Sequence, residues 1–158
     1  MVSRIGTGAV CAALALAVAA CGGAPETEST EGADTHAEHA AVSRVFFVQP
    51  TDGATISTEA QLVFGSEMFD IAAVPPGEIA EADVRPGTGH YHVAIDADCL
   101  PPGQIIPKAD PWIHFGTGAN TADITLTPGT HRLTVQAGDD QHRTLEGLCE
   151  TITVTVAG

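Results

Sequence analysis

From Arg44 onward the sequence is a series of short runs rich in Val, Ile, Thr and Phe, separated by clusters of Pro, Gly and Asp. No stretch keeps the helical period for more than two turns, so the runs predict β-strands joined by turns. Such spacing favours an all-β domain over residues 44–158, a two-sheet sandwich of immunoglobulin-like type. Residues 68–89 contain two Pro-Gly turns and predict a long irregular loop. The predicted strands are 45–48, 61–65, 90–96, 122–126, 131–137 and 150–156.

The first twenty residues have the features of an export signal. Arg4 supplies a positive charge, and residues 5–20 form an uncharged, Ala-rich run that is short for a membrane span. The run ends in Val-Ala-Ala-Cys21-Gly22, which resembles the bacterial lipobox, whose cysteine is lipidated before cleavage. We therefore predict a signal peptide over residues 1–20 and a palmitate-type membrane anchor on Cys21. The alternative is an ordinary cleavage site followed by a coincidental cysteine.

This N-terminus also predicts where the protein resides and how the domain is attached. Gly22 after the anchor is typical of an outer-membrane lipoprotein if the host is Gram-negative. Residues 21–43 are mainly Gly, Ala, Thr, Ser and Glu with no aromatic residue, so they favour a flexible tether. His36 and His39 lie in this tether, and we interpret the segment as a solvated spacer in preference to a transient metal site. The sequence thus predicts a sandwich domain held at the cell envelope.

The charge of the chain excludes one class of partner. Six Lys and Arg stand against 20 Asp and Glu, which gives a formal net charge of −14. Phosphate backbones require clustered cations, so we expect no nucleic acid to bind. Aromatic residues make up 4% of the sequence, which is also poor for stacking on sugars or bases.

Two cysteines, Cys99 and Cys149, remain in the exported domain. Exported thiols tend to pair, so a disulfide between them is the simplest expectation. It would close a loop of roughly 50 residues, which the chain-entropy model values at about 4 kcal/mol. Thiolate ligation of a metal and two free thiols are the alternatives.

A His-Tyr-His sequence provides the main functional clue. Side chains alternate across a strand, so Tyr91, Val93 and Ile95 point to one side. Because this apolar set must enter the core, His90 and His92 share the opposite face. Their Cα atoms are then about 7 Å apart, close enough for two imidazoles to bind one ion. Two polar residues on a wet sheet face are the alternative.

Further histidines extend this candidate site. His114 is out of phase with its apolar neighbours Ile113 and Phe115, and His142 follows an acidic turn at the end of a predicted strand. We predict His90, His92 and His114 as ligands, with His142 as a fourth. His131 instead has the parity of the core residues of its strand, which favours a hydrogen-bonded core histidine.

The donor types limit the choice of ion. Imidazoles suit copper or zinc, and the scattered carboxylates lack the spacing of a calcium loop. Met68 adds a soft thioether, and its spacing from His90 resembles that of periplasmic copper chaperones of cupredoxin-like fold. Ser57 and His92 depart from that pattern, so Met68 is either a fifth candidate ligand or a filler of the core.

Several blocks of sequence together resemble a known family. They are RVFFVQPTDGATI, GTGHYHVAID, IHFGTG, PGTHRLTVQAGDDQH and TITVTV, and they extend from Arg44 to Val156. The sequence is similar to a bacterial envelope family described only as domain of unknown function 4399. The resemblance implies an envelope sandwich domain and supplies no activity. The family pattern often has a third histidine where this chain has Tyr91.

Three functions remain open on these observations. The first is a non-enzymatic lipoprotein that binds copper or zinc through its histidines. The second is an interaction or structural module whose loops contact an envelope protein or polymer without a metal. The third is a metal-dependent enzyme in which Asp96 or Asp139 would act as base, although no P-loop, catalytic triad or His-Glu-x-x-His motif is present.

Overall fold

A computed structural model describes residues 42–158 of the chain. It contains β-strands and a single 3-10 turn, η1 (Glu81–Asp83), in the described part. No helix in this part is long and apolar enough to cross a bilayer. The strands are β1 (Arg44–Gln49), β2 (Thr55–Ile56), β3 (Glu59–Glu67), β4 (Asp70–Ile71), β5 (Thr88–Ile95), β6 (Trp112–Phe115), β7 (Thr121–Thr125), β8 (Gly129–Gly138) and β9 (Thr144–Val156).

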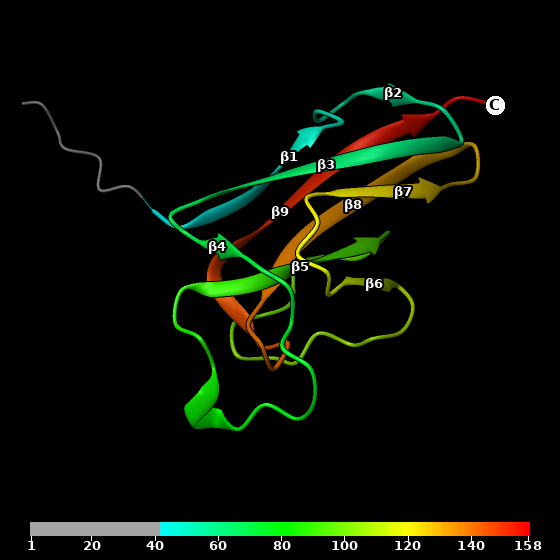
Figure 1. The fold of residues 1–158 in the computed structure, drawn as a ribbon. Helices are drawn as coiled ribbons and strands as arrows, with labels where there is room; N and C mark the ends of the chain where they lie inside the picture. The colour runs from blue at the N-terminus through cyan, green and yellow to red at the C-terminus, as the bar shows by residue number, and fades with distance from the viewer. Residues whose placement is uncertain (1–41) are drawn as a thin grey trace, which may run out of the picture. The chain divides into compact units, whose positions relative to one another are not determined.

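The strands form two sheets, as Figure 1 shows. The smaller sheet has the order β1-β3-β7, and all its pairs are antiparallel. The larger sheet has the order β2-β9-β8-β5-β4, and β6 also pairs with β5. The prediction of an all-β, two-sheet sandwich is therefore confirmed.

The hydrophobic core lies between the two sheets because each strand turns its alternate apolar residues inward. On β5 these are Tyr91 and Val93, which are 1% and 0% exposed. Leu62 of β3 and Val135 of β8 join them from opposite sheets. The predicted parity of β5 is therefore correct, and His90 and His92 lie on the outer face of the larger sheet.

A second apolar cluster covers part of that outer face. Ala94, Ile106 and Trp112 are buried together, and Leu100 packs against them. The backbone N–H of Ile106 donates to the carbonyl of His142 at 2.9 Å, which fastens this covering segment to the β8–β9 turn. The segment that contains Ile106 thus covers part of the face that carries the histidines. The alternative, two polar residues on a solvent-exposed sheet face, is not what the structure shows, because His90 and His92 are buried.

The six predicted strands correspond to β1, β3, β5, β7, β8 and β9. The ends differ by one or two residues, except that β9 begins at Thr144, six residues before the predicted start. β2, β4 and β6 were not predicted as strands, because two to four residues are too few to show a period. The predicted loop 68–89 also needs correction, since β4 lies inside it and β5 begins at Thr88. Its irregular part is residues 72–87.

The predicted disulfide is confirmed: Cys99 and Cys149 are bonded, with Cα atoms 6.1 Å apart. It ties the segment that follows β5 to β9, on the sheet that carries the histidines. The signal peptide, Cys21, His36 and His39 lie outside the described residues, and their predictions stay predictions.

Candidate metal centre

Strand β5 places the first two histidines. His90 and His92 lie two residues apart on the same face, and both are 0% exposed. Their ring centroids are 4.5 Å apart. Two imidazoles are therefore held side by side, away from water.

The neighbouring strand brings the third histidine. β6 pairs antiparallel with β5, and His114 is directly opposite His92 in the register. Cross-strand partners point to the same face of a sheet, so His114 joins the pair. Its Nε2 lies 3.1 Å from Nε2 of His90.

The turn between β8 and β9 brings the fourth. His142 has a φ of 67°, a left-handed conformation that is uncommon for a residue with a side chain. The carboxylate of Asp139 holds the turn by accepting bonds from the backbone N–H groups of Gln141 at 2.8 Å and Arg143 at 2.9 Å. Nε2 of His142 consequently lies 3.0 Å from Nε2 of His114.

Two glycines leave the space that these rings occupy. A Cβ on Gly116 would lie 2.4 Å from Cε1 of His114, and a Cβ on Gly138 would lie 3.1 Å from Cε1 of His92. The first distance forces the ring of His114 to shift, so Gly116 must be glycine if that ring is to keep its place. The second is closer than an ordinary contact by only a few tenths of an ångström, so Gly138 leaves the ring of His92 little spare room.

The four histidines converge on one point. One ligand nitrogen from each ring lies within 4.8 Å of the others. The group, which we call the histidine cluster, consists of His90, His92, His114 and His142. Sequence reasoning named all four, and the structure brings them together.

Hydrogen bonding alone does not account for this convergence. A ring nitrogen carries either one proton or one lone pair, so it makes one full hydrogen bond. Nε2 of His114 nevertheless has two nitrogen neighbours, at 3.1 Å and 3.0 Å. In addition, both ring nitrogens of His92 and Nδ1 of His90 are buried without a hydrogen-bond partner. Unpaired buried nitrogens are costly, and a shared cation would pair one nitrogen of His92 and take up the crowded Nε2 atoms of His90, His114 and His142.

The cluster is neutral at ordinary pH because burial opposes charge. Desolvation, together with a smaller contribution from the neighbouring imidazoles, lowers the pKa of His90 to about 3 and that of His92 to about 2. Desolvation also lowers the pKa values of His114 and His142, and the positive charge of Lys108 adds to this effect. Neutral imidazole is the form that binds a metal ion.

A buried ion pair supports the turn that carries His142. The carboxylate of Asp140 is fully buried and accepts bonds from Nε of Arg85 at 2.9 Å and Nη2 at 2.6 Å. The pair fastens the 72–87 loop to the β8–β9 turn, and Arg85 also donates to the carbonyl of Ala73 within the loop. Sequence reasoning missed this pair; the only signal was an acidic turn beside a candidate ligand.

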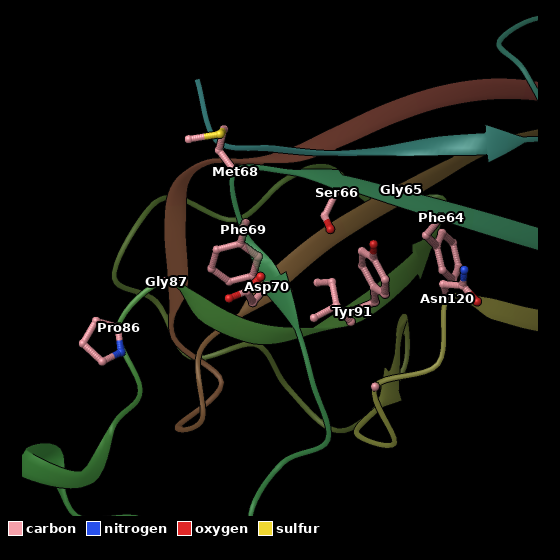
Figure 2. A pocket seen from close by; sticks show the side chains of 12 residues that line it. Phe64, Gly65, Ser66, Met68, Phe69, Asp70, Pro86, Gly87, Tyr91 and Asn120 are labelled. Carbon is pink, nitrogen blue, oxygen red and sulfur yellow. The ribbon is translucent and has the colours of Figure 1, made fainter. Parts of the chain in front are cut away.

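The structure does not bring Met68 to the cluster. Met68 is 69% exposed and lines a separate cavity of about 820 Å³. Tyr91 lines the same cavity, as Figure 2 shows, so the cavity lies on the opposite side of β5 from His90 and His92. Met68 follows the end of β3 and is exposed instead of filling the core.

The other titratable residues considered above are also accounted for. Asp96 accepts a bond from Nδ1 of His131 at 2.8 Å, and it lies away from the histidine cluster. Nε2 of His131 faces the carbonyl of Thr127 at 2.9 Å, so His131 is hydrogen-bonded, as expected, but it is only partly buried and does not belong to the core. The hydrogen bond to Asp96 raises the pKa of His131, in contrast to the four clustered histidines.

Comparison with known proteins identifies a family and little beyond it. Comparison with curated proteins finds no matching sequence. Among solved structures, the fold resembles part of the endo-beta-1,4-mannanase from Thermotoga petrophila, with 13% identity and a TM-score of 0.43. The similarity covers 77% of this chain and 21% of that chain, so this chain spans about a fifth of the enzyme. A family model described as a domain of unknown function, DUF4399, matches residues 73–157, more than half of the chain and all four clustered histidines. The chain therefore belongs to the DUF4399 family.

Proposed function

We propose that this protein is an exported, lipid-anchored lipoprotein that binds copper or zinc through the histidine cluster and does not catalyse a reaction. The observation that carries the metal-binding part is the convergence of three Nε2 atoms, from His90, His114 and His142, with contacts of 3.0 and 3.1 Å. Nε2 of His114 can make one full hydrogen bond, so hydrogen bonding does not account for both contacts.

The distances agree with ligands around one ion. Two nitrogens about 2.0–2.1 Å from a zinc ion are roughly 3.3 Å apart at a tetrahedral angle and roughly 2.9 Å apart at a right angle. The two measured Nε2 contacts fall between these values.

The number of donors favours binding over catalysis. A catalytic zinc site typically has three protein ligands and an open position for water. Here four imidazoles surround the same point. No carboxylate belongs to the group, and Asp96 is engaged with His131. A site that holds an ion is therefore the simpler proposal.

The attachment to the envelope rests on the N-terminal sequence. The uncharged run before Cys21 and the following acidic stretch of small and polar residues favour a lipid anchor and a spacer, with the outer membrane as location in a Gram-negative host. Metabolic labelling with a palmitate analogue tests this part. Labelling that persists in Cys21→Ser would contradict it.

Metal content after dialysis tests the binding part. Possible donors outside the described residues are first removed: Cys11, which lies in the predicted signal peptide, and Cys21 are changed to Ser, and His36 and His39 are changed to Ala. We call this the background variant. It is dialysed against zinc or copper and its bound metal is measured. We expect one ion per chain, because the four donors meet at one point.

Two variants of this background separate the cluster from its surroundings. His90→Ala with His92→Ala removes half of the donors, and we expect stoichiometric binding to disappear. His131→Gln removes an imidazole outside the cluster and should leave binding intact. His114→Ala provides a second ligand variant at a partly buried position if the double variant folds poorly. Unchanged stoichiometry in both ligand variants would refute the proposal.

A further inference from the structure

The donors of the histidine cluster are all nitrogen atoms, and no sulfur ligand is near them in the described part of the chain. Cys99 and Cys149 are consumed in the disulfide. Met68 is the only methionine among residues 42–158, and it lies exposed at the mouth of the other cavity. Thiolates and thioethers select Cu⁺, whereas imidazoles suit Zn²⁺ and Cu²⁺. The donor set thus favours a divalent ion.

The spacing of the donors supports the same choice. Ligands on opposite sides of an ion, the arrangement of two-coordinate Cu⁺, would be about 4 Å apart at a metal–nitrogen distance of about 2 Å. The Nε2 atoms of His90 and His114 are 3.1 Å apart, and those of His114 and His142 are 3.0 Å apart. Both are distances between adjacent ligands of a site with four donors.

The scaffold gives these donors little freedom to adopt the opposed arrangement. His90 and His92 are fixed on one strand, and His114 is fixed opposite them by the β5–β6 register. The ring of His114 also lies against Gly116, where even a Cβ would collide with it. The cluster is therefore held in an arrangement with several adjacent nitrogens.

From these observations we infer that the histidine cluster selects a metal ion in its divalent state, Cu²⁺ or Zn²⁺, and discriminates against Cu⁺. This inference rests on the metal-binding function proposed above. It assigns the oxidation state of the copper that the protein holds, and it separates this site from sulfur-containing sites for Cu⁺.

Three competition titrations of the background variant test the inference. Zn²⁺ and Cu²⁺ are each titrated against a chelator of known affinity, and Cu⁺ is titrated without oxygen against bicinchoninate. We expect Cu²⁺ to bind at least tenfold more tightly than Cu⁺. A tenfold preference lowers the reduction potential of bound copper by about 59 mV relative to free copper in the same buffer, which voltammetry measures independently.

Met68→Leu is the matched control, because Met68 is exposed and its replacement leaves the cluster untouched. We expect this variant to bind all three ions as before. Tighter binding of Cu⁺ than of Cu²⁺, or a loss of Cu⁺ affinity in Met68→Leu, would overturn the inference while leaving metal binding in place. Failure of every ion to bind would instead overturn the metal-binding function itself.

Discussion

Replacing Gly116 by alanine tests the architecture of the histidine cluster without removing a ligand. The new Cβ would lie 2.4 Å from Cε1 and 2.9 Å from Nε2 of His114, whereas ordinary contacts begin at 3.4 Å. The ring must therefore move by about 1 Å, which is several times the tolerance of about 0.2 Å for a metal–nitrogen bond. We expect His114 to leave the coordination sphere.

The expected loss follows from this displacement. Disturbing the support of a metal ligand typically weakens binding by about 10–100-fold, which corresponds to roughly 1.4–2.7 kcal/mol. The fold itself should tolerate the change, because Gly116 is not among the glycines with positive φ and its carbonyl can still accept the N–H of Val74. The thermal midpoint of the metal-free protein should consequently change little.

A double-mutant cycle provides the assay. Zinc affinity is measured by chelator competition for Gly116→Ala, His114→Ala and the two combined. If Gly116 acts only through the ring of His114, the double variant binds zinc as weakly as His114→Ala alone, so the two losses do not add. Undiminished affinity in Gly116→Ala, or losses that add fully, would refute the reasoning.

Other properties of the molecule lead to further predictions. Burial lowers the pKa values of His90 and His92 to about 3 and about 2, so the unfolded chain binds protons below pH 6.5 that the folded chain does not. The free energy of unfolding is therefore largest above pH 6.5 and falls as the pH drops toward 3, by about 1.4 kcal/mol per pH unit for each histidine. Urea unfolding of the metal-free protein at pH 7, 6 and 5 measures this loss, and a free energy that does not change with pH contradicts it. Loss of the Cys99–Cys149 disulfide, which spans 50 residues, should lower the free energy of unfolding by about 4 kcal/mol in the same experiment, and equal stability of the reduced protein would count against that value. Arg85→Ala should speed amide hydrogen exchange in the 72–87 loop and the β8–β9 turn but not in β3, because it removes the ion pair that fastens the two segments; unaltered exchange in the loop would show that other contacts hold it.

Local patterns were enough to identify the fold class and the candidate ligands. Alternation along β5 assigned Tyr91 and Val93 to the core and turned His90 and His92 to the other face, as the structure confirms. The same argument selected His114, and the acidic turn after β8 drew attention to His142. The predictions for β5 and β6 succeeded because side-chain direction in a strand depends on parity alone, whereas His142 lies in a turn, where parity gives no direction.

Tertiary structure decided what surrounds that face. The register that places His114 opposite His92 depends on how β6 docks on β5, and a four-residue strand carries no period that reveals its partner. The covering segment that buries the cluster, the Arg85–Asp140 pair and the position of Met68 on the opposite side of β5 likewise result from packing between distant segments. The sequence thus determined which side chains leave the core, but only the folded chain determined that four of them meet. Sequence periodicity encodes direction relative to the local backbone, whereas convergence depends on the relative placement of separate strands and turns.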